Sequence, residues 1–198
     1  MCLTDELPLE ELKKIITRQR PYASIREGGT KGQKELGVLQ DLLESMQRAG
    51  DERYHDPKLA IADPPDCTAR TRSEALVAVE VSEFVSQAAI EFNARTQREL
   101  GLRPGITETV VHQWTGPAFL AALGAILARK DTRVFKGGPY QEVLVVIHTD
   151  EPLLVRQTCE AWLADHEFGP FNTLTRGYFL YPYEPPSGYP YRSLFVAT

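Results

Sequence analysis

The chain has 198 residues, of which 42% are hydrophobic, and a formal net charge of -5. This length predicts one domain with a substantial core, and the negative charge excludes binding to nucleic acid through bulk positive charge, although a local basic patch can coexist with it. The three cysteines form no CxxC pair, which excludes a disulfide framework and a zinc finger and leads us to expect a cytoplasmic protein. The longest apolar run, 119–128, is too short to span a bilayer, so we expect no membrane partner.

In the first half of the chain, helical periodicity gives way to strand-like segments. In chain order the expected elements are a helix over 5–20, a basic connector over 21–33, a helix over 34–48, and strands over 57–62 and 76–82. Leucines at helical spacing support the second helix, and alternating valines support the second strand. We therefore expect an N-terminal arm, 1–33, followed by a single domain, 34–198.

The second half of the chain predicts further helices and strands. In chain order they are a helix over 83–100, a loop over 101–108, a helix over 117–129, a strand over 142–148, a helix over 153–165 and a C-terminal β-hairpin around Ser187. Tyrosines of this hairpin could stack on bases or pack against the sheet, and packing is the favoured reading. The whole order predicts a mixed α/β fold with a central mixed sheet flanked by helices.

Two carboxylates mark the main candidate site. In the segment LVAVEVSE, Glu80 stands among valines, where an ionised carboxylate is unfavourable unless a cation meets it. Asp66 lies a short turn upstream, at the end of the preceding segment. Two carboxylates that converge from neighbouring strands form an all-oxygen site suited to Mg²⁺ or Mn²⁺. The alternatives are a turn-forming role for Asp66 and a structural ion pair between Glu80 and an arginine.

The pattern Pro65-Asp66 followed by Glu80-Val81-Ser82 resembles the PD-(D/E)XK nuclease superfamily, over about residues 34–165. The resemblance implies a restriction-endonuclease-like core and a phosphodiesterase that cleaves DNA or RNA. It also implies Asp66 and Glu80 as catalytic residues that hold Mg²⁺ or Mn²⁺ together with the carbonyl of Val81.

Ser82 departs from the superfamily pattern, because it stands where the superfamily has a lysine. A lysine from another element is therefore needed, and the candidates are Lys58, Lys130 and Lys136. We select Lys130, which the RKD segment places at a helix terminus, as the group that stabilises charge on the phosphate. The superfamily's first-helix acid corresponds to Glu35 as an additional metal ligand, against the ordinary alternative of a solvated surface glutamate.

A basic stretch before and within the second expected helix is a candidate contact for the phosphate backbone. Its selected members are Arg26, Lys31 and Lys34, and a solvated face is the simpler alternative. Ordinary structural roles are favoured for Glu83, His148 and Cys67, which would open a helix, end a strand and pack in the core. The alternatives are a site role for Glu83, metal ligation by His148 together with Asp150, and a nucleophilic Cys67.

Two functions therefore stay open. The first is a metal-dependent nuclease, and the second is a non-catalytic interaction protein on the same fold that binds a protein partner. The missing lysine at Ser82 favours the second function. Retention of both carboxylates favours the first, because a chain without metal would be stabilised by an apolar residue at Glu80. The oligomeric state is not predicted.

Overall fold

The structure is a computed structural model, which describes residues 30–86, 112–151 and 153–197 together with residues 91, 95 and 99. Several expectations lie outside these residues: the helix over 5–20, the loop over 101–108, most of the connector with Arg26, and most of the helix over 83–100. Among the described residues, no helix is both long enough and apolar enough to cross a membrane.

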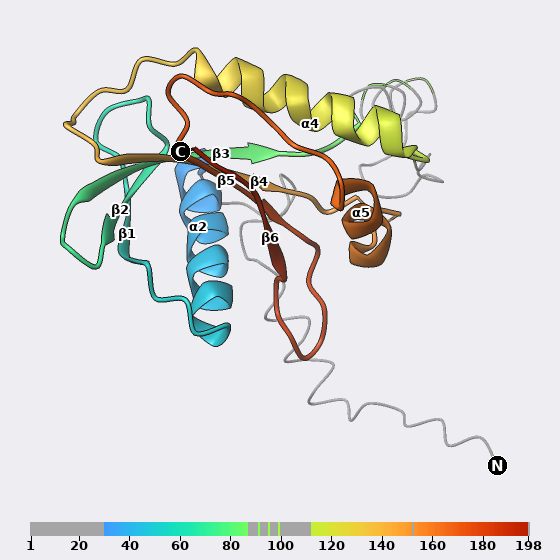
Figure 1. Ribbon diagram of the computed structural model, residues 1–198, viewed down its shortest axis with the longest axis horizontal. Coiled ribbons are helices and arrows are strands. Elements are labelled where there is room, and N and C mark those ends of the chain that lie inside the picture. The colour runs from blue at the N-terminus through green and yellow to red at the C-terminus, as the bar shows by residue number, and fades with distance from the viewer. Residues whose placement is uncertain are drawn as a thin grey trace.

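A six-stranded sheet forms the centre of the fold, with its strands in the order β1-β2-β3-β4-β5-β6 (Figure 1). The strands are β1 Tyr54–Leu59, β2 Cys67–Thr71, β3 Leu76–Glu83, β4 Glu142–His148, β5 Arg176–Leu180 and β6 Tyr191–Val196. The first three strands pair antiparallel, β3 to β5 run parallel, and β6 returns antiparallel to β5. This arrangement confirms the expected mixed α/β class with a central mixed sheet.

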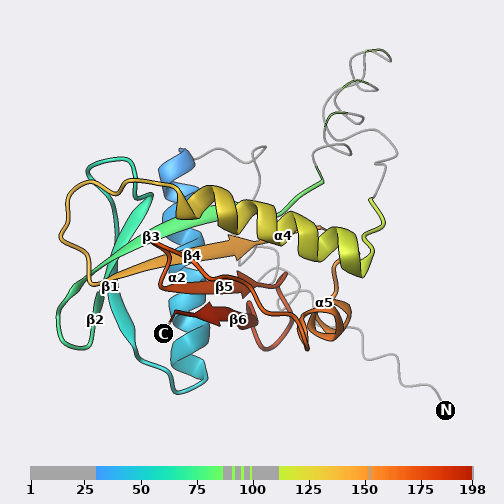
Figure 2. The same ribbon diagram turned by 45° about the horizontal axis from the view of Figure 1, so that its top comes forward.

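Helices cover both faces of the sheet, as the two views in Figures 1 and 2 show. Helix α2, Lys31–Arg48, packs Val38, Leu39, Leu42 and Met46 onto one face. Helix α4, Gly116–Asp131, and helix α5, Arg156–Leu163, cover the other face. The buried residues of α4 are spaced by whole helical turns, which presents one apolar stripe to the sheet. The fold thus has three layers, and the sheet is buried between helices.

The alternation along β3 decides which layer each side chain enters. Val77, Val79 and Val81 join the core beneath α2, whereas Ala78 joins the core beneath α4. Because side chains alternate along a strand, Glu80 shares the α4 face with Ala78. The expected strand over 76–82 is therefore confirmed, and its acid faces the C-terminal half of α4.

Three expectations around the site were wrong. The strand expected over 57–62 is β1 at Tyr54–Leu59. Asp66 does not end a segment but directly precedes a further strand, β2, which the sequence did not predict. Only Cys67, Ala69 and Thr71 of β2 are buried, so its alternation carries too little apolar character to stand out in the sequence. Glu83 ends β3 instead of opening a helix.

Helix α2 begins earlier than expected, at Lys31 instead of residue 34. Thr30 caps it, because its side chain accepts from the Gln33 N–H while the Gln33 side chain accepts from the Thr30 N–H, a capping box within the supposed connector. This earlier start places Lys31 and Lys34 on the first turn of the helix.

The C-terminal strands are a part of the main sheet and not a hairpin laid over it. Strand β5 pairs parallel with β4, and β6 pairs with β5. Tyr178, Tyr181 and Tyr189 are buried in the two cores, which agrees with the packing role favoured from the sequence.

Candidate active site

Asp66 lies at the point where β3 extends beyond its neighbouring strand β2. Strand β2 starts at Cys67, which pairs with Val79, so the later residues of β3 extend beyond β2. The Asp66 Oδ2 accepts a hydrogen bond from the Val81 N–H at 2.9 Å and so takes the place of a strand partner. The Asp66 carbonyl also accepts from the Ala60 N–H at 3.2 Å. The side chain and the backbone carbonyl of Asp66 are therefore both hydrogen-bonded, and its carboxylate lies beside β3.

Glu80 is fully buried on the α4 side of β3, where two cations reach one of its oxygens. Lys130 Nζ lies 2.5 Å and Arg133 Nη1 lies 2.8 Å from Glu80 Oε2. The other oxygen, Oε1, has no hydrogen-bond partner among the described residues. A buried carboxylate with two cations on one oxygen and none on the other has an unused acceptor, which is rare in a folded core.

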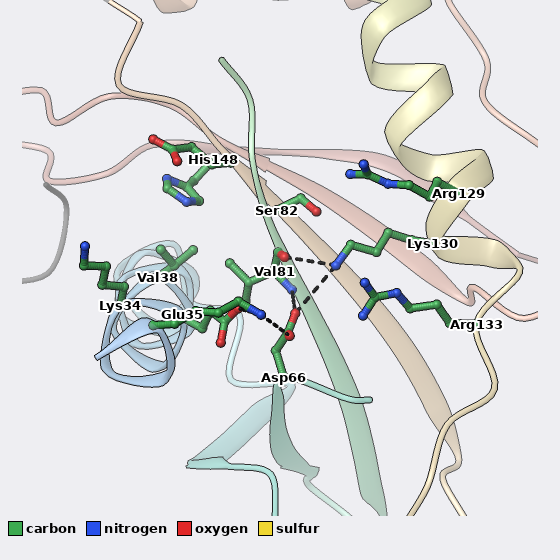
Figure 3. Close-up of a pocket in the computed structure, with 12 residues that line it drawn as sticks. Lys34, Glu35, Val38, Asp66, Val81, Ser82, Arg129, Lys130, Arg133 and His148 are labelled. Carbon is green, nitrogen blue, oxygen red and sulfur yellow. Dashed lines mark hydrogen bonds and ion pairs between the residues drawn. The ribbon is translucent and has the colours of Figure 1, made fainter. Parts of the chain in front are cut away.

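Lys130 joins the two acids. Its Nζ also donates to the Val81 carbonyl at 3.1 Å and lies 3.6 Å from Asp66 Oδ2 (Figure 3). The Lys130 side chain is only 5% exposed, and those of Asp66 and Glu80 are 3% and 0% exposed. The end of α4, strand β3 and the residue before β2 thus meet at one ammonium group, which lies among the three oxygens that the resemblance implies as metal ligands.

Glu35 belongs to the same cluster and is not a solvated surface residue. Its side chain is 13% exposed, and its Oε1 lies 3.1 Å from Lys31 Nζ, which itself lies 3.8 Å from Asp66 Oδ1. Burial and the neighbouring negative charge of Asp66 raise the pKa of the Glu35 carboxyl. A carboxyl whose pKa is raised by burial and by a neighbouring acid is a candidate functional group.

A cavity of about 510 Å³ opens over these residues (Figure 3). Its lining comprises Lys31, Lys34, Glu35, Val38, Asp66, Val81, Ser82, Glu83, Arg129, Lys130, Arg133 and His148. The cations come from α2 on one side and from the end of α4 and the residues after it on the other. The cavity is therefore a local basic patch in a chain of negative net charge, and it has the charge that a phosphate group requires.

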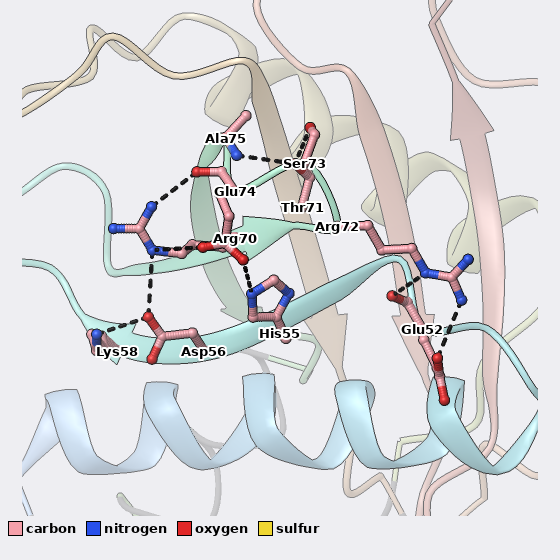
Figure 4. Close-up of polar contacts among 10 residues, drawn as sticks. All are labelled: Glu52, His55, Asp56, Lys58, Arg70, Thr71, Arg72, Ser73, Glu74 and Ala75. Atoms are coloured by element: carbon pink, nitrogen blue, oxygen red, sulfur yellow. Dashed lines mark hydrogen bonds and ion pairs between the residues drawn. The ribbon is translucent and has the colours of Figure 1, made fainter.

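Of the three lysines considered as substitutes at Ser82, only Lys130 is in the cavity lining. Lys58 pairs with Asp56 at 2.7 Å on the exposed β1–β2 ladder, in the polar network of Figure 4. Lys136 donates to the Asp63 carbonyl at 2.7 Å and ties two loops together. The structure thus brings Asp66, Glu80, Lys130, Val81 and Glu35 together, with Lys31 and Lys34 in the same cavity.

Arg133 and Arg129 are the cavity residues that sequence reasoning missed. The available signal was the cluster of basic residues in RKDTR at a predicted helix end, although Arg133 itself lies just past the C-cap Thr132 of α4. Glu83 and His148 also line the cavity, and they are neighbours in the register between β3 and β4.

Cys67 adjoins Asp66 but packs in the core, as expected. It is fully buried, and burial raises the pKa of its thiol to about 12. A thiol with such a pKa stays protonated at neutral pH and does not act as a nucleophile.

The described residues contain no group of three or more histidine, cysteine, aspartate or glutamate side chains arranged around a single point for a metal. The donor set here consists of two carboxylates and a backbone carbonyl, with Glu35 beside them. No protein-family model, no curated protein and no solved structure matches this chain.

Proposed function

We propose that this chain is a metal-dependent nuclease, a phosphodiesterase that cleaves the backbone of DNA or RNA. The observation that carries the proposal is the convergence of Asp66, Glu80 and the buried Lys130 at one point beside a basic cavity. Two acids and a lysine are the residue types that the PD-(D/E)XK resemblance implies, and here the lysine comes from α4.

The order of the elements supports this proposal. Helix α2 precedes the antiparallel strands β1, β2 and β3, and α4 then leads to β4, which runs parallel to β3. The resemblance implies the same succession: a helix, a strand hairpin that carries the acids, a helix and a further strand. On this basis we assign the α2 to β4 region to a restriction-endonuclease-like core.

The residues present fit a hard divalent ion. Asp66, Glu80 and the Val81 carbonyl offer only oxygen, and Mg²⁺ binds through one or two carboxylates while it keeps several waters. The unpartnered Glu80 Oε1 is an oxygen that can accept a further ligand, and Glu35 lies beside Asp66, where burial raises the pKa of its carboxyl. When bound, the ion would polarise the phosphate and lower the pKa of a water.

The protein's own groups supply the remaining requirements. Lys130 and Arg133 lie where positive charge would stabilise the oxygens of a phosphate in the cavity. Lys31 and Lys34, on the opposite wall, would hold the neighbouring backbone phosphates. Glu35 would serve as an additional ligand or hold a water beside Asp66.

A second candidate function is an interaction protein without catalysis. Two observations favour it. Lys130 and Arg133 both form ion pairs with Glu80, and Ser82 leaves the superfamily's lysine position without charge. In that case the cluster is a buried structural ion network, and the basic cavity binds an acidic partner.

Cleavage assays separate the two functions. We expect the purified chain to cleave single-stranded or double-stranded DNA or RNA when Mg²⁺ or Mn²⁺ is present. Glu80→Gln should reduce the rate at least about a hundredfold, because several kcal/mol of stabilisation by the metal would be lost. Lys130→Ala should reduce it comparably, whereas Lys58→Ala is the control that keeps the rate of the unaltered chain. Circular dichroism should verify that each variant is folded.

The absence of metal-dependent cleavage on all these substrates, together with an unchanged metal affinity in Glu80→Gln, would contradict the nuclease proposal and leave the interaction protein.

A further inference from the structure

We infer that Lys130 holds the cation position of the Asp66 and Glu80 site, and that a divalent ion binds there by displacing the Lys130 ammonium. The inference rests on the proposed function, since it concerns the ion of that site. It goes further in assigning Lys130 two successive positions, one among the acids and one in the cavity.

The contacts of the ammonium carry the first step. Lys130 Nζ lies 2.5 Å from Glu80 Oε2, 3.1 Å from the Val81 carbonyl and 3.6 Å from Asp66 Oδ2. These are the three oxygens that would ligate the ion: two of them accept hydrogen bonds from the ammonium, and the Asp66 carboxylate pairs with its charge. The Lys130 ammonium therefore occupies the position among these oxygens that a metal ion would take.

Charge repulsion carries the second step. A divalent ion takes its ligands at about 2.0 to 2.6 Å, so it would lie within a few ångströms of an ammonium that kept its present place. Two cations so close repel strongly where the side chains are nearly inaccessible to water, as they are for Lys130, Asp66 and Glu80. The ion and the ammonium therefore exclude one another.

The cavity gives the displaced ammonium somewhere to go. Lys130 is one of the residues that line it, and a lysine has a flexible four-carbon stem. Rotation about the bonds of this stem can move the ammonium from the acids into the cavity. Arg133 occupies the same Glu80 oxygen at 2.8 Å and is 36% exposed, so it can follow in the same direction. Both cations would then face the substrate phosphate, which couples loading of the ion to binding of the substrate.

This exchange predicts that substitution of Lys130 raises the affinity for Mn²⁺ and lowers the cleavage rate. Lys130→Met vacates the cation position, so Mn²⁺ should bind more tightly, while cleavage should be lost because no ammonium remains for the phosphate. A lysine that acts on the phosphate alone would lose cleavage without a specific gain in metal affinity. General charge removal is controlled by Lys34→Met, which deletes one positive charge from the same cavity at α2.

The test measures Mn²⁺ binding by isothermal titration calorimetry and thermal unfolding with and without Mn²⁺. We expect the dissociation constant of Lys130→Met to fall about tenfold or more below that of the unaltered chain, and that of Lys34→Met to fall by less than about threefold. Without Mn²⁺, Lys130→Met should unfold at a lower temperature, because its acids lose their cation. Added Mn²⁺ should restore most of this difference.

Each contrary result has its own meaning. If the unaltered chain binds Mn²⁺ and Lys130→Met binds it no more tightly than Lys34→Met does, the exchange is overturned while the proposed function stands. If neither the unaltered chain nor Lys130→Met binds Mn²⁺, both are overturned. Should Lys130→Met give no folded protein even in Mn²⁺, Lys130→Gln takes its place, and a Gln variant that Mn²⁺ stabilises no more than the unaltered chain also overturns the exchange.

Discussion

Asp66 serves as the strand partner of Val81, since its Oδ2 accepts the Val81 N–H at 2.9 Å where β2 has not yet begun. This contact determines the geometry of the site. It aligns Asp66 with the same stretch of β3 that carries Glu80, and it leaves the Val81 carbonyl to Lys130. The backbone of β3 thus connects the two acids.

Substitutions at Asp66 should separate the role of this hydrogen bond from the role of the charge. Asp66→Ala leaves the buried Val81 N–H without an acceptor, so we expect a loss of about 1 to 3 kcal/mol in the free energy of unfolding. Asp66→Asn keeps an oxygen acceptor and should lose less stability, yet it should lose Mn²⁺ affinity as severely as Asp66→Ala. Urea denaturation and calorimetry measure the two quantities. Equal destabilisation by both variants would show that the hydrogen bond to Val81 does not stabilise the fold.

Lys34 should contribute to nucleic-acid affinity through charge alone. In the absence of divalent metal, we expect Lys34→Ala to weaken binding of a fluorescent oligonucleotide and to reduce the slope of log affinity against log salt by about 1. Fluorescence anisotropy at several salt concentrations measures this slope. Lys58→Ala is the matched control, because Lys58 is paired with Asp56 on the exposed β1–β2 ladder. A slope that Lys34→Ala leaves unchanged would exclude Lys34 as a phosphate contact.

Asp131 should make the stability of the fold depend on pH. Burial acts to raise the pKa of its carboxyl, but hydrogen bonds from the backbone N–H groups of Asn172, Thr173 and Leu174 lower it below the ordinary value of 3.8. A lowered folded-state pKa means that Asp131 stabilises the protein above the ordinary pKa, and that this contribution is lost as the pH falls toward the folded-state pKa.

We therefore expect Asp131→Asn to be less stable than the unaltered chain at neutral pH, with the difference shrinking below about pH 4. Chemical denaturation at a series of pH values measures this difference. A difference that stays constant across the acid range would mean that the Asp131 charge has no part in fixing the loop at 172–174.

The sequence predicted the parts of the site that obey strong local rules. Glu80 stood out because a carboxylate among alternating valines is unfavourable without a cation, and Lys130 stood out because a helix terminus brings it next to a turn. The mixed sheet followed from the apolar runs of β3 and β4, which are buried on both faces as parallel central strands are.

The parts that were missed depend on tertiary context. The short β2 alternates Thr and Arg with buried Cys, Ala and Thr, a pattern too polar to be recognised until β1 and β3 are seen on either side. The role of Asp66 as a strand partner arises only because β2 starts one residue later. Likewise, the pairing of Arg133 with Glu80 depends on the turn after α4, where helical spacing no longer places a side chain.

A crystal structure grown with Mn²⁺ tests the central claim most directly, because anomalous scattering locates the ion without reference to any assay. We predict one Mn²⁺ peak ligated by Asp66, Glu80 and the Val81 carbonyl at about 2.0 to 2.4 Å, with the Lys130 ammonium moved out into the cavity. A structure at saturating Mn²⁺ that shows no peak there, with Lys130 still on Glu80, would contradict the metal site and the nuclease proposed from it.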